Sequence, residues 1–288
     1  MVLDRHSEDT TLPVDGDLEE HTSVARFADD GGNLHDCGDL GGEDEIQPLV
    51  PDYPDVTCDA SSSVTLLRVT AGDEWIANSA RVSNAGEFVT DRTKNARLID
   101  SLMKHRHGIP FESGYLEVKV ACPLFVAGQI LRHRIGWSFS VKSGRYGTMG
   151  QVFYLPDSDR PLINVGSSMR PKLSFGDTPL ATLERATLSI QKAYGAAWQA
   201  YHDLLDQGIT HEVARIVLPE GIYTEFWARC NPRSLMSFLS LRVSHDANQY
   251  ETHPQYETEE VAWALDDLLR QHWPDTYEAF LKYGRVAP

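Results

Sequence analysis

The acidic residues of this chain are gathered near its start, and this asymmetry limits which part of the sequence can fold. Residues 1–60 hold 17 Asp or Glu residues against Arg5 and Arg26, a net charge of −15 out of −16 for all 288 residues. The same residues are rich in Gly, Asp and Pro and lack periodic apolar spacing, so they cannot bury enough surface to offset their chain entropy. We predict a mostly disordered acidic tail over residues 1–62 and one folded domain over residues 63–288.

The predicted domain is almost neutral, with 25 acidic and 24 basic residues from residue 61 onward. An anionic substrate is therefore not excluded. Two interpretations of the tail stay open: an acidic arm that recruits a partner or guards the domain electrostatically, and a solvated extension without a specific role. The tail does not resemble a signal peptide, because no basic start precedes an apolar run. No stretch of the chain approaches the ~20 apolar residues that span a bilayer.

The four cysteines are scattered along the chain without the spacing of metal ligands. They are Cys37, Cys58, Cys122 and Cys230. This pattern argues against a disulfide scaffold and against a structural zinc site. We expect no metal and a reducing, cytoplasmic setting.

Apolar spacing predicts strands early and helices late in the domain. Residues 64–70 are mostly β-branched or apolar, and residues 116–120 alternate apolar with charged side chains, as strands do. Helical spacing is predicted for residues 91–105, 123–134, 182–205, 233–242, 259–272 and 276–283. No internal repeat and no βαβ alternation occur, so the sequence favours an α+β fold.

A dense basic cluster follows the apolar segment that begins at Pro123. Gln129, Arg132 and His133 would share one face of the expected helix, and Arg134 adds a further charge. Neighbouring bases repel one another unless an anion compensates them, and arginine binds phosphate in a planar, bidentate way. The alternative, that these arginines pair with acids of the fold, stays open at this stage.

Further groups in the sequence could complete an anion site. The hydroxyls of Ser138, Ser140 and Ser143 and the amide of Gly144 come shortly after the basic cluster, and Arg145 follows them. Arg215, Arg233 and Arg242 form a second basic group downstream, the last two at opposite ends of a predicted helix. No glycine-rich loop has the spacing of a Rossmann or P-loop site, so a dinucleotide would have to bind through side chains.

These motifs resemble the signature of the flavin-dependent thymidylate synthase family (ThyX). The signature is carried by Arg132-His133-Arg134 followed by Ser143-Gly144-Arg145-Tyr146. The resemblance covers about residues 64–284 and extends, in the family's order, through Ala80–Ser83, His107–Glu112, Gln129, Ala214–Pro219, Asn231–Arg242 and Gln249–Glu251. Matches spread over such a length are more specific than any single triplet.

The resemblance implies an FAD-dependent enzyme that methylates dUMP to dTMP. It implies an antiparallel sheet with a predominantly helical remainder, and a homotetramer with FAD at subunit interfaces and dUMP stacked on the flavin ring. Methylenetetrahydrofolate would donate the carbon and NADPH would reduce the flavin. No cysteine attacks the pyrimidine in this family, so Cys230 is interpreted as a packed thiol.

The resemblance also assigns roles by position. Expected flavin contacts are Ser83, His107, Arg132, His133, Arg134, Asn231, Arg233 and His245, although His245 is equally well explained as a surface or hydrogen-bonding histidine. Expected nucleotide contacts are Gln129, Arg132, Ser143, Gly144, Arg145, Arg215 and Arg242. Arg242 and Ser143 are expected at the reacting centre, where a cation at Arg242 would stabilise negative charge as carbon 5 becomes nucleophilic.

The signature departs from the family pattern at several positions. Eight residues separate Arg134 from Ser143 where the family usually has seven, with Trp137 as part of the surplus. Ser140 and Val141 stand where the family usually has Asn and Glu. Ile109 and Ser237 replace polar residues of the flavin site, and about one additional residue occurs near residues 245–249.

These departures leave several functions open. Besides methylation of dUMP, we consider hydroxymethylation at carbon 5, action on dCMP, and a catalytically silent homologue that binds nucleotide or flavin. A membrane partner is not expected. Nucleic-acid binding is disfavoured, because the tail is acidic and the domain has no net positive charge.

Overall fold

The computed structural model describes residue 54 and residues 56–288, except residues 85, 159, 169 and 175–179. Most of the predicted acidic tail therefore lies outside the described residues. Strand β1 (Thr57–Asp59) falls within the range expected for the tail and pairs in parallel with β5 (Val152–Tyr154). Residues 57–59 therefore belong to the folded part of the chain, because they have a sheet partner that is distant in the sequence.

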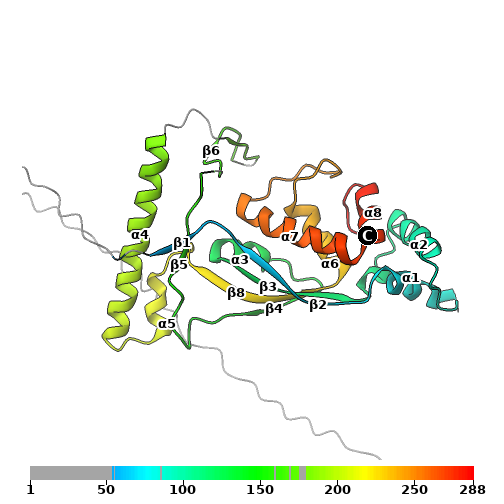
Figure 1. Cartoon of the computed structure of the whole chain (residues 1–288), viewed down its shortest axis with the longest axis horizontal. Helices are drawn as coiled ribbons and strands as arrows, with labels where there is room; N and C mark the ends of the chain where they lie inside the picture. Colours follow the sequence, from blue (N-terminus) through cyan, green and yellow to red (C-terminus); the bar gives the residue numbers. More distant parts are fainter. Residues whose placement is uncertain (1–53, 55, 85, 159, 169, 175–179) are drawn as a thin grey trace, which may run out of the picture. The chain divides into compact units, whose positions relative to one another are not determined.

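A four-stranded antiparallel sheet forms the centre of the domain (Figure 1). Its strands, in spatial order, are β2 (Ser63–Thr70), β3 (Tyr115–Pro123), β8 (Tyr223–Cys230) and β4 (Trp137–Val141). A register shift interrupts the pairing of β2 with β3 between Leu66 and Arg68. A short pair of antiparallel strands, β6 (Ile163–Asn164) and β7 (Leu173–Ser174), lies apart from this sheet. The predicted α+β class with an antiparallel sheet is confirmed.

One face of the sheet is buried under three helices. Alternate residues of β3, such as Val118 and Val120, and of β8, such as Phe226 and Ala228, are almost fully buried. Their neighbours point to the opposite face, where Trp227 is 51% exposed. The covering helices are α3 (Leu124–Ile130), α6 (Pro232–Arg242) and α7 (Tyr256–His272), which lie on the same side of the sheet in Figure 1.

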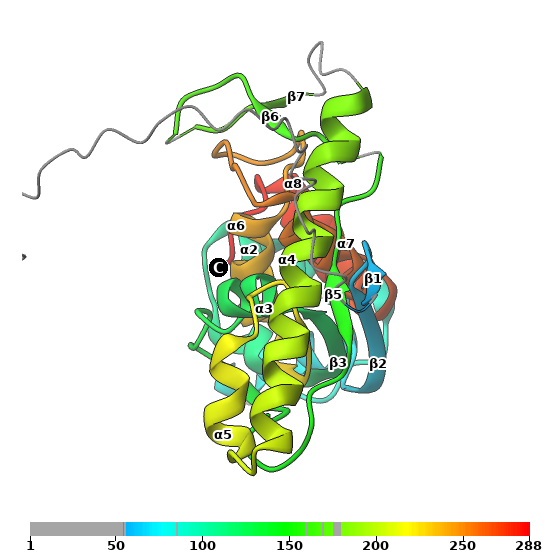
Figure 2. The same cartoon turned by 90° about the vertical axis from the view of Figure 1, so that its left-hand side faces the viewer.

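Further helices flank this core at its two ends. At one end are α1 (Asp73–Arg81), η1 (Val82–Asn84), α2 (Arg92–Lys104), η2 (Ile109–Glu112) and α8 (Pro274–Lys282). At the other are α4 (Leu180–Asp206), α5 (His211–Ala214) and η3 (Arg215–Val217), with α4 and α5 side by side in Figure 2. The aromatic rings of Phe153, Trp198 and Tyr201 form a second, smaller core against α4. No helix in the described part of the chain is long and apolar enough to cross a membrane.

Most predicted helices are confirmed to within a few residues, but the helix expected over residues 123–134 is shorter. It ends at Ile130, and the N–H of His133 donates to the carbonyl of Ile130 in the following turn. Arg132, His133 and Arg134 therefore do not share a helical face with Gln129. The chain leaves the helix because β4 must begin at Trp137 to pair with β8, and Gly136 supplies the positive φ of 70° for the turn.

A buried ion pair fixes the C-terminal segment to the core. Arg285 is 1% exposed and donates from Nη2 to Oδ1 of Asp266, while the hydroxyl of Tyr277 donates to Oδ2 of the same carboxylate at 2.7 Å. The guanidinium also lies over the ring of Phe280. Removing one partner of such a pair leaves a charge buried without compensation.

We therefore expect Asp266→Asn to lower the free energy of unfolding by about 3–5 kcal/mol in a urea titration. Asp267→Asn is the matched control, because Asp267 pairs with Arg270 on the surface, where both side chains are more than half exposed. That change should cost at most about 1 kcal/mol. Equal effects of the two substitutions would contradict the structural importance of the buried pair.

Candidate functional site

Arg242 is the last residue of α6 and joins two other segments of the core. Its Nε donates to Nε2 of His133 at 3.3 Å, and its Nη1 donates to Oε1 of Gln129 at 3.2 Å. Nη2 takes part in neither bond. The guanidinium of Arg242 is thereby held between α3 and the turn that follows it, and the structure brings together three residues, Arg242, Gln129 and His133, whose ligand contacts stay predictions.

His133 is kept neutral by this arrangement. Burial, together with the charge of Arg242, lowers the pKa of His133 to about 4. Because Nε2 accepts a hydrogen bond, the proton of the neutral ring must be on Nδ1. The edge of the ring also packs against Phe238, with ring centroids 4.8 Å apart.

Several arginines of the predicted site lack an acidic partner. Burial, and then the charge of Arg132, lowers the pKa of Arg242. Arg132, Arg134, Arg215 and Arg242 make no ion pair with any of the described residues, in contrast to the arginines that do pair. Arg132 and Arg242 are close enough to repel one another, and a bound anion would relieve that repulsion.

Two other predicted arginines pair with glutamates. Arg145 contacts Glu212 at 3.1 Å, and Arg233 contacts Glu112 at 2.7 Å. All four side chains are more than one third exposed, so these pairs are weak and can exchange for a ligand. Pairing with acids of the fold therefore applies to Arg145 and Arg233, and binding of an anion by the other arginines stays a prediction.

The predicted nucleotide loop lies beside η3. The N–H of Arg145 donates to Oγ of Ser143 at 3.3 Å. Gly144 is buried, and a Cβ placed on it would lie 2.6 Å from Sδ of Met149 and 3.3 Å from Cδ of Arg215. Glycine thus allows the loop to approach Arg215, so the structure brings together Ser143, Gly144, Arg145 and Arg215, whose role as nucleotide contacts stays a prediction.

A cavity of about 440 Å³ lies beside η2 and contains two predicted flavin contacts. Ser83 and His107 line it together with Ser79, Ala80, Leu102, Arg106, Gly108, Ile109 and Pro110. Arg106 was not predicted, although it precedes His107 directly and has a positive φ of 59°. Its position in the sequence next to a predicted contact was the available signal.

Asn231 and Arg233 lie at the start of α6. The side chain of Asn231 caps the helix by accepting from the N–H of Ser234 at 2.8 Å. Arg233 donates from Nε to the carbonyl of Pro288 at 2.7 Å. A Cβ on Gly108 would lie 2.5 Å from Nε of Arg233, so glycine lets this guanidinium sit against the wall of the cavity at His107.

The predicted residues do not form one site within a single chain. The Ser143–Arg145 loop follows Val141, which pairs with Phe226, whereas η2 leads to the end of the sheet at Cys230. Phe226 and Cys230 are roughly 13 Å apart along β8, and each group extends beyond its end of the strand. Figure 1 places α5 and α1 correspondingly at opposite ends of the sheet.

His245 has the surroundings of a hydrogen-bonding histidine. Its Nδ1 accepts from the N–H of Ala247 at 2.9 Å, and its ring faces Trp263 at 5.9 Å. Neither contact involves another predicted flavin residue. Its role as a flavin contact stays a prediction.

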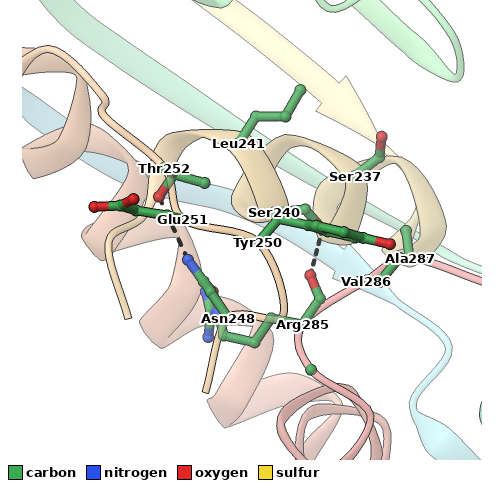
Figure 3. A pocket seen from close by; sticks show the side chains of 11 residues that line it. Ser237, Ser240, Leu241, Asn248, Tyr250, Glu251, Thr252, Arg285, Val286 and Ala287 are labelled. Carbon is green, nitrogen blue, oxygen red and sulfur yellow. Dashed lines mark hydrogen bonds between the residues drawn. The ribbon is translucent and has the colours of Figure 1, made fainter. Parts of the chain in front are cut away.

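A second cavity, of about 330 Å³, lies beside α6 (Figure 3). Ser237, Leu241 and Tyr250 are among the residues that line it, and Ser240 donates to the carbonyl of Arg285 at 2.6 Å. Ser237, one of the departures from the family pattern, is exposed in this cavity and does not support the core.

The sequence contains Gln-Tyr-Glu-Thr twice, at residues 249–252 and 255–258, and the resemblance was placed on the first copy. Tyr250 and its neighbours line the second cavity. The second copy begins α7, and Gln255 is the residue that contacts Gln129. The contact between Gln129 and Gln255 was therefore missed, although the recurrence of these four residues was a visible signal.

The additional residue of the signature does not form a bulge in β4. Residues 137–141 pair regularly with β8, and Trp137 packs on the buried face, stacked on Phe139. Val141 is 43% exposed at the end of the strand. Cys230 is 2% exposed, and burial raises its pKa, so the interpretation as a packed thiol is confirmed.

Comparisons with known proteins agree on one family. Residues 65–275 match the family model described as thymidylate synthase complementing protein. The flavin-dependent thymidylate synthase of Streptomyces avermitilis is 39% identical over 232 residues, which are 78% of this chain and 93% of that protein. The enzyme of the same name from Streptomyces coelicolor is 37% identical over 82% of this chain and 98% of its own.

A solved structure has the same fold. It is the UMP/dUMP methylase PolB from Streptomyces cacaoi bound with 5-Br UMP, which superposes with a TM-score of 0.74 at 36% identity. The match covers 82% of this chain and all of PolB. A second structure of PolB, bound with 5-Br dUMP, matches with the same TM-score.

The low pKa of His133 predicts a pH dependence of stability. Between about pH 6.5 and pH 4 the unfolded chain binds a proton at His133 that the folded chain does not, so the free energy of unfolding should decrease as the pH falls through this window. His133→Gln should make this decrease smaller in urea titrations at pH 7 and pH 4.5. Titrations at pH 7 and pH 8, above the window, are the control; an unchanged slope below pH 6.5 would contradict the assignment.

Proposed function

The chain belongs to the flavin-dependent thymidylate synthase family, and from this membership we propose that it methylates carbon 5 of dUMP to give dTMP, with FAD as the cofactor. One observation connects the proposed reaction with particular residues. Arg242, beside Arg132 and without an acidic partner among the described residues, is held by Gln129 and the neutral ring of His133. This is a fixed cation of the kind that stabilises charge developing on a pyrimidine ring.

The residues present fit a flavin dinucleotide. Arg132 and Arg134 are exposed and unopposed by acids of the described chain, which suits a pyrophosphate. The cavity lined by Ser83 and His107 has room for part of the cofactor. Because Gly108 has no Cβ, the guanidinium of Arg233 can pack against the backbone at this edge of the cavity. The residues proposed to hold FAD are Ser83, His107, Arg132, His133, Arg134, Asn231, Arg233 and His245. When bound, the reduced flavin supplies the hydride that completes the methyl group.

The nucleotide phosphate is assigned to the group of residues around the Ser143–Arg145 loop. Arg145, Arg215 and the loop around Ser143 would bind its phosphate, while Gln129 and Arg132 would contact the remainder. Because Arg145 is paired only with an exposed glutamate, a phosphate can replace that partner at little cost. Arg242 would donate to a carbonyl oxygen of the base, and its orientation makes this possible without rearrangement at the moment of reaction.

We propose that the two groups meet in a homotetramer, because they lie at opposite ends of the sheet in one chain. Apolar side chains next to the predicted contacts are strongly exposed: Val82 (76%), Ile109 (79%), Ile135 (92%) and Ile216 (76%). Contacts between chains would bury them. Methylenetetrahydrofolate as carbon donor, NADPH as reductant and a cytoplasmic setting complete the proposal.

A second candidate substrate is UMP. PolB, which shares this fold, is described as a UMP/dUMP methylase and was solved with analogues of both nucleotides. Mass spectrometry of the products from dUMP, UMP and dCMP separates these possibilities. Formation of dTMP supports the leading proposal, while conversion of UMP or dCMP alone would replace it.

One prediction of the proposed function concerns Arg242. Arg242→Gln removes the cation but keeps a hydrogen-bond donor, and we expect it to lower kcat for dTMP formation by about 100-fold or more. Flavin content and the free energy of unfolding should change little. Turnover within threefold of the wild type would remove Arg242 from the reaction.

A second prediction of the proposed function concerns the wall of the cavity at His107. Gly108→Ala places a methyl group against the guanidinium of Arg233, which must then leave its contacts with Glu112 and Pro288. We expect less FAD per protein chain after purification, measured by absorbance. Gly150→Ala is the control, because a Cβ there meets nothing within 4 Å. Equal flavin content in both variants would contradict this placement of Arg233.

A further inference from the structure

Glu257 is a buried carboxylate that is connected with Arg242 through two glutamines. It lies in the first turn of α7 and is 2% exposed. Its Oε1 accepts from the hydroxyl of Tyr154 at 2.7 Å and from Nε of Arg160 at 2.8 Å, and its Oε2 accepts from Nε2 of Gln255 at 3.0 Å. Burial alone would raise the pKa of Glu257, but the hydrogen bonds from Arg160 and Tyr154 outweigh it and the pKa is lowered. The carboxylate is therefore charged at neutral pH.

A continuous series of hydrogen bonds connects this carboxylate with Arg242. Oε1 of Gln255 accepts from Nε2 of Gln129, and Oε1 of Gln129 accepts from Nη1 of Arg242 at 3.2 Å. We name Gln129 and Gln255 the glutamine bridge. The bridge joins three helices, α3, α6 and the start of α7, over the buried face of the sheet.

The two ends of the series determine the direction of every bond in it. An ionised carboxylate only accepts hydrogen bonds and a guanidinium only donates them. With Glu257 at one end, the amide NH2 of Gln255 must face the carboxylate and its oxygen must face Gln129. The NH2 of Gln129 must then face Gln255, which turns its own oxygen toward Arg242.

We propose that Gln255 and Glu257 are positioning residues for Arg242, which act through Gln129 by fixing the direction of the glutamine bridge. This inference rests on the proposed function for the role of Arg242, but the hydrogen bonds themselves do not. Neither Gln255 nor Glu257 is itself among the residues proposed to contact the nucleotide. Their effect on the reaction passes entirely through the orientation of the Arg242 guanidinium.

The support for Glu257 comes from a distant part of the chain. Tyr154 ends β5 and Arg160 follows it, and burial together with the contact to Glu257 raises the pKa of Tyr154, so its hydroxyl remains a donor. Arg160 is 16% exposed and also lies over the ring of Tyr256. Both donors are therefore fixed before any ligand binds, and the bridge needs no ligand to set its direction.

The test interrupts the bridge without removing a charge. Gln255→Met has a similar length but neither an amide donor nor an amide acceptor, and it leaves the Arg160–Glu257 pair intact. We expect kcat for dTMP formation to fall about tenfold, the loss of one oriented hydrogen bond, while KM for dUMP changes less than threefold. Gln271→Met, in an exposed position of the same helix, is the matched control and should behave as the wild type.

A double variant separates positioning from a general structural effect. If Gln255 acts through Gln129, Gln255→Met should lower kcat little further in a Gln129→Ala background. Glu257→Gln replaces the carboxylate, which only accepts hydrogen bonds, with an amide that can also donate them. Like Gln255→Met, it should lower kcat more than it changes KM for dUMP. Multiplicative losses in the double variant would overturn the proposal, as would wild-type kcat in both Gln255→Met and the smaller Gln255→Ala.

A measurement that does not depend on turnover distinguishes a failure of this inference from a failure of the proposed function. Arg242 contributes to the low pKa of His133, so an Arg242 side chain released from the bridge should let the pKa of His133 rise in Gln255→Met. Histidine-selective NMR titration measures this change, with the His133 signal assigned from its loss in His133→Gln. A wild type that forms no dTMP would overturn the proposed function alone; an unshifted His133 in Gln255→Met would overturn the glutamine bridge.

Discussion

The burial of one face of the β2–β3–β8–β4 sheet is the constraint on which the rest of the domain depends. Alternate apolar residues of β3 and β8 exclude water from that face, and α6 can lie only across them. Because α6 is packed along its length, its two ends are fixed in space. Arg233 and Arg242 are thereby held at opposite ends of one rigid element, which places a cation at the cavity near His107 and another above α3.

The charges of the domain are distributed unequally between its interior and the site. In the interior, two cations are paired with carboxylates: the buried Arg285 with Asp266, and the partly buried Arg160 with Glu257. At the site, Arg132, Arg134, Arg215 and Arg242 have none among the described residues. Such repulsion lowers stability, and it is tolerated here because these side chains keep contact with solvent and gain free energy when an anion binds. The near-neutral charge of the domain conceals this local excess of positive charge.

Local sequence patterns predicted most of the fold, and they failed where pairing between distant segments decided the outcome. The alternation in residues 116–120 and the stripes of α2, α4, α7 and α8 are local properties, and each element formed where its pattern indicated. The segment after Ile130 has helical spacing, but pairing of β4 with β8 requires a turn at Gly136. The hydrogen bonds that β4 makes with β8 outweigh one more turn of helix, so the basic triplet lies in a loop.

The sequence by itself determined the chemistry available to this protein: which residues are cationic, which segments form helices and strands, and which family the chain resembles. Only the tertiary structure decided which arginines are opposed by acids and which Gln-Tyr-Glu-Thr copy meets Gln129. The physical reason is that a hydrogen bond or ion pair acts over about 3 Å. No local pattern can specify contacts between residues more than 100 positions apart; they depend on how α3, α6 and α7 pack on the sheet.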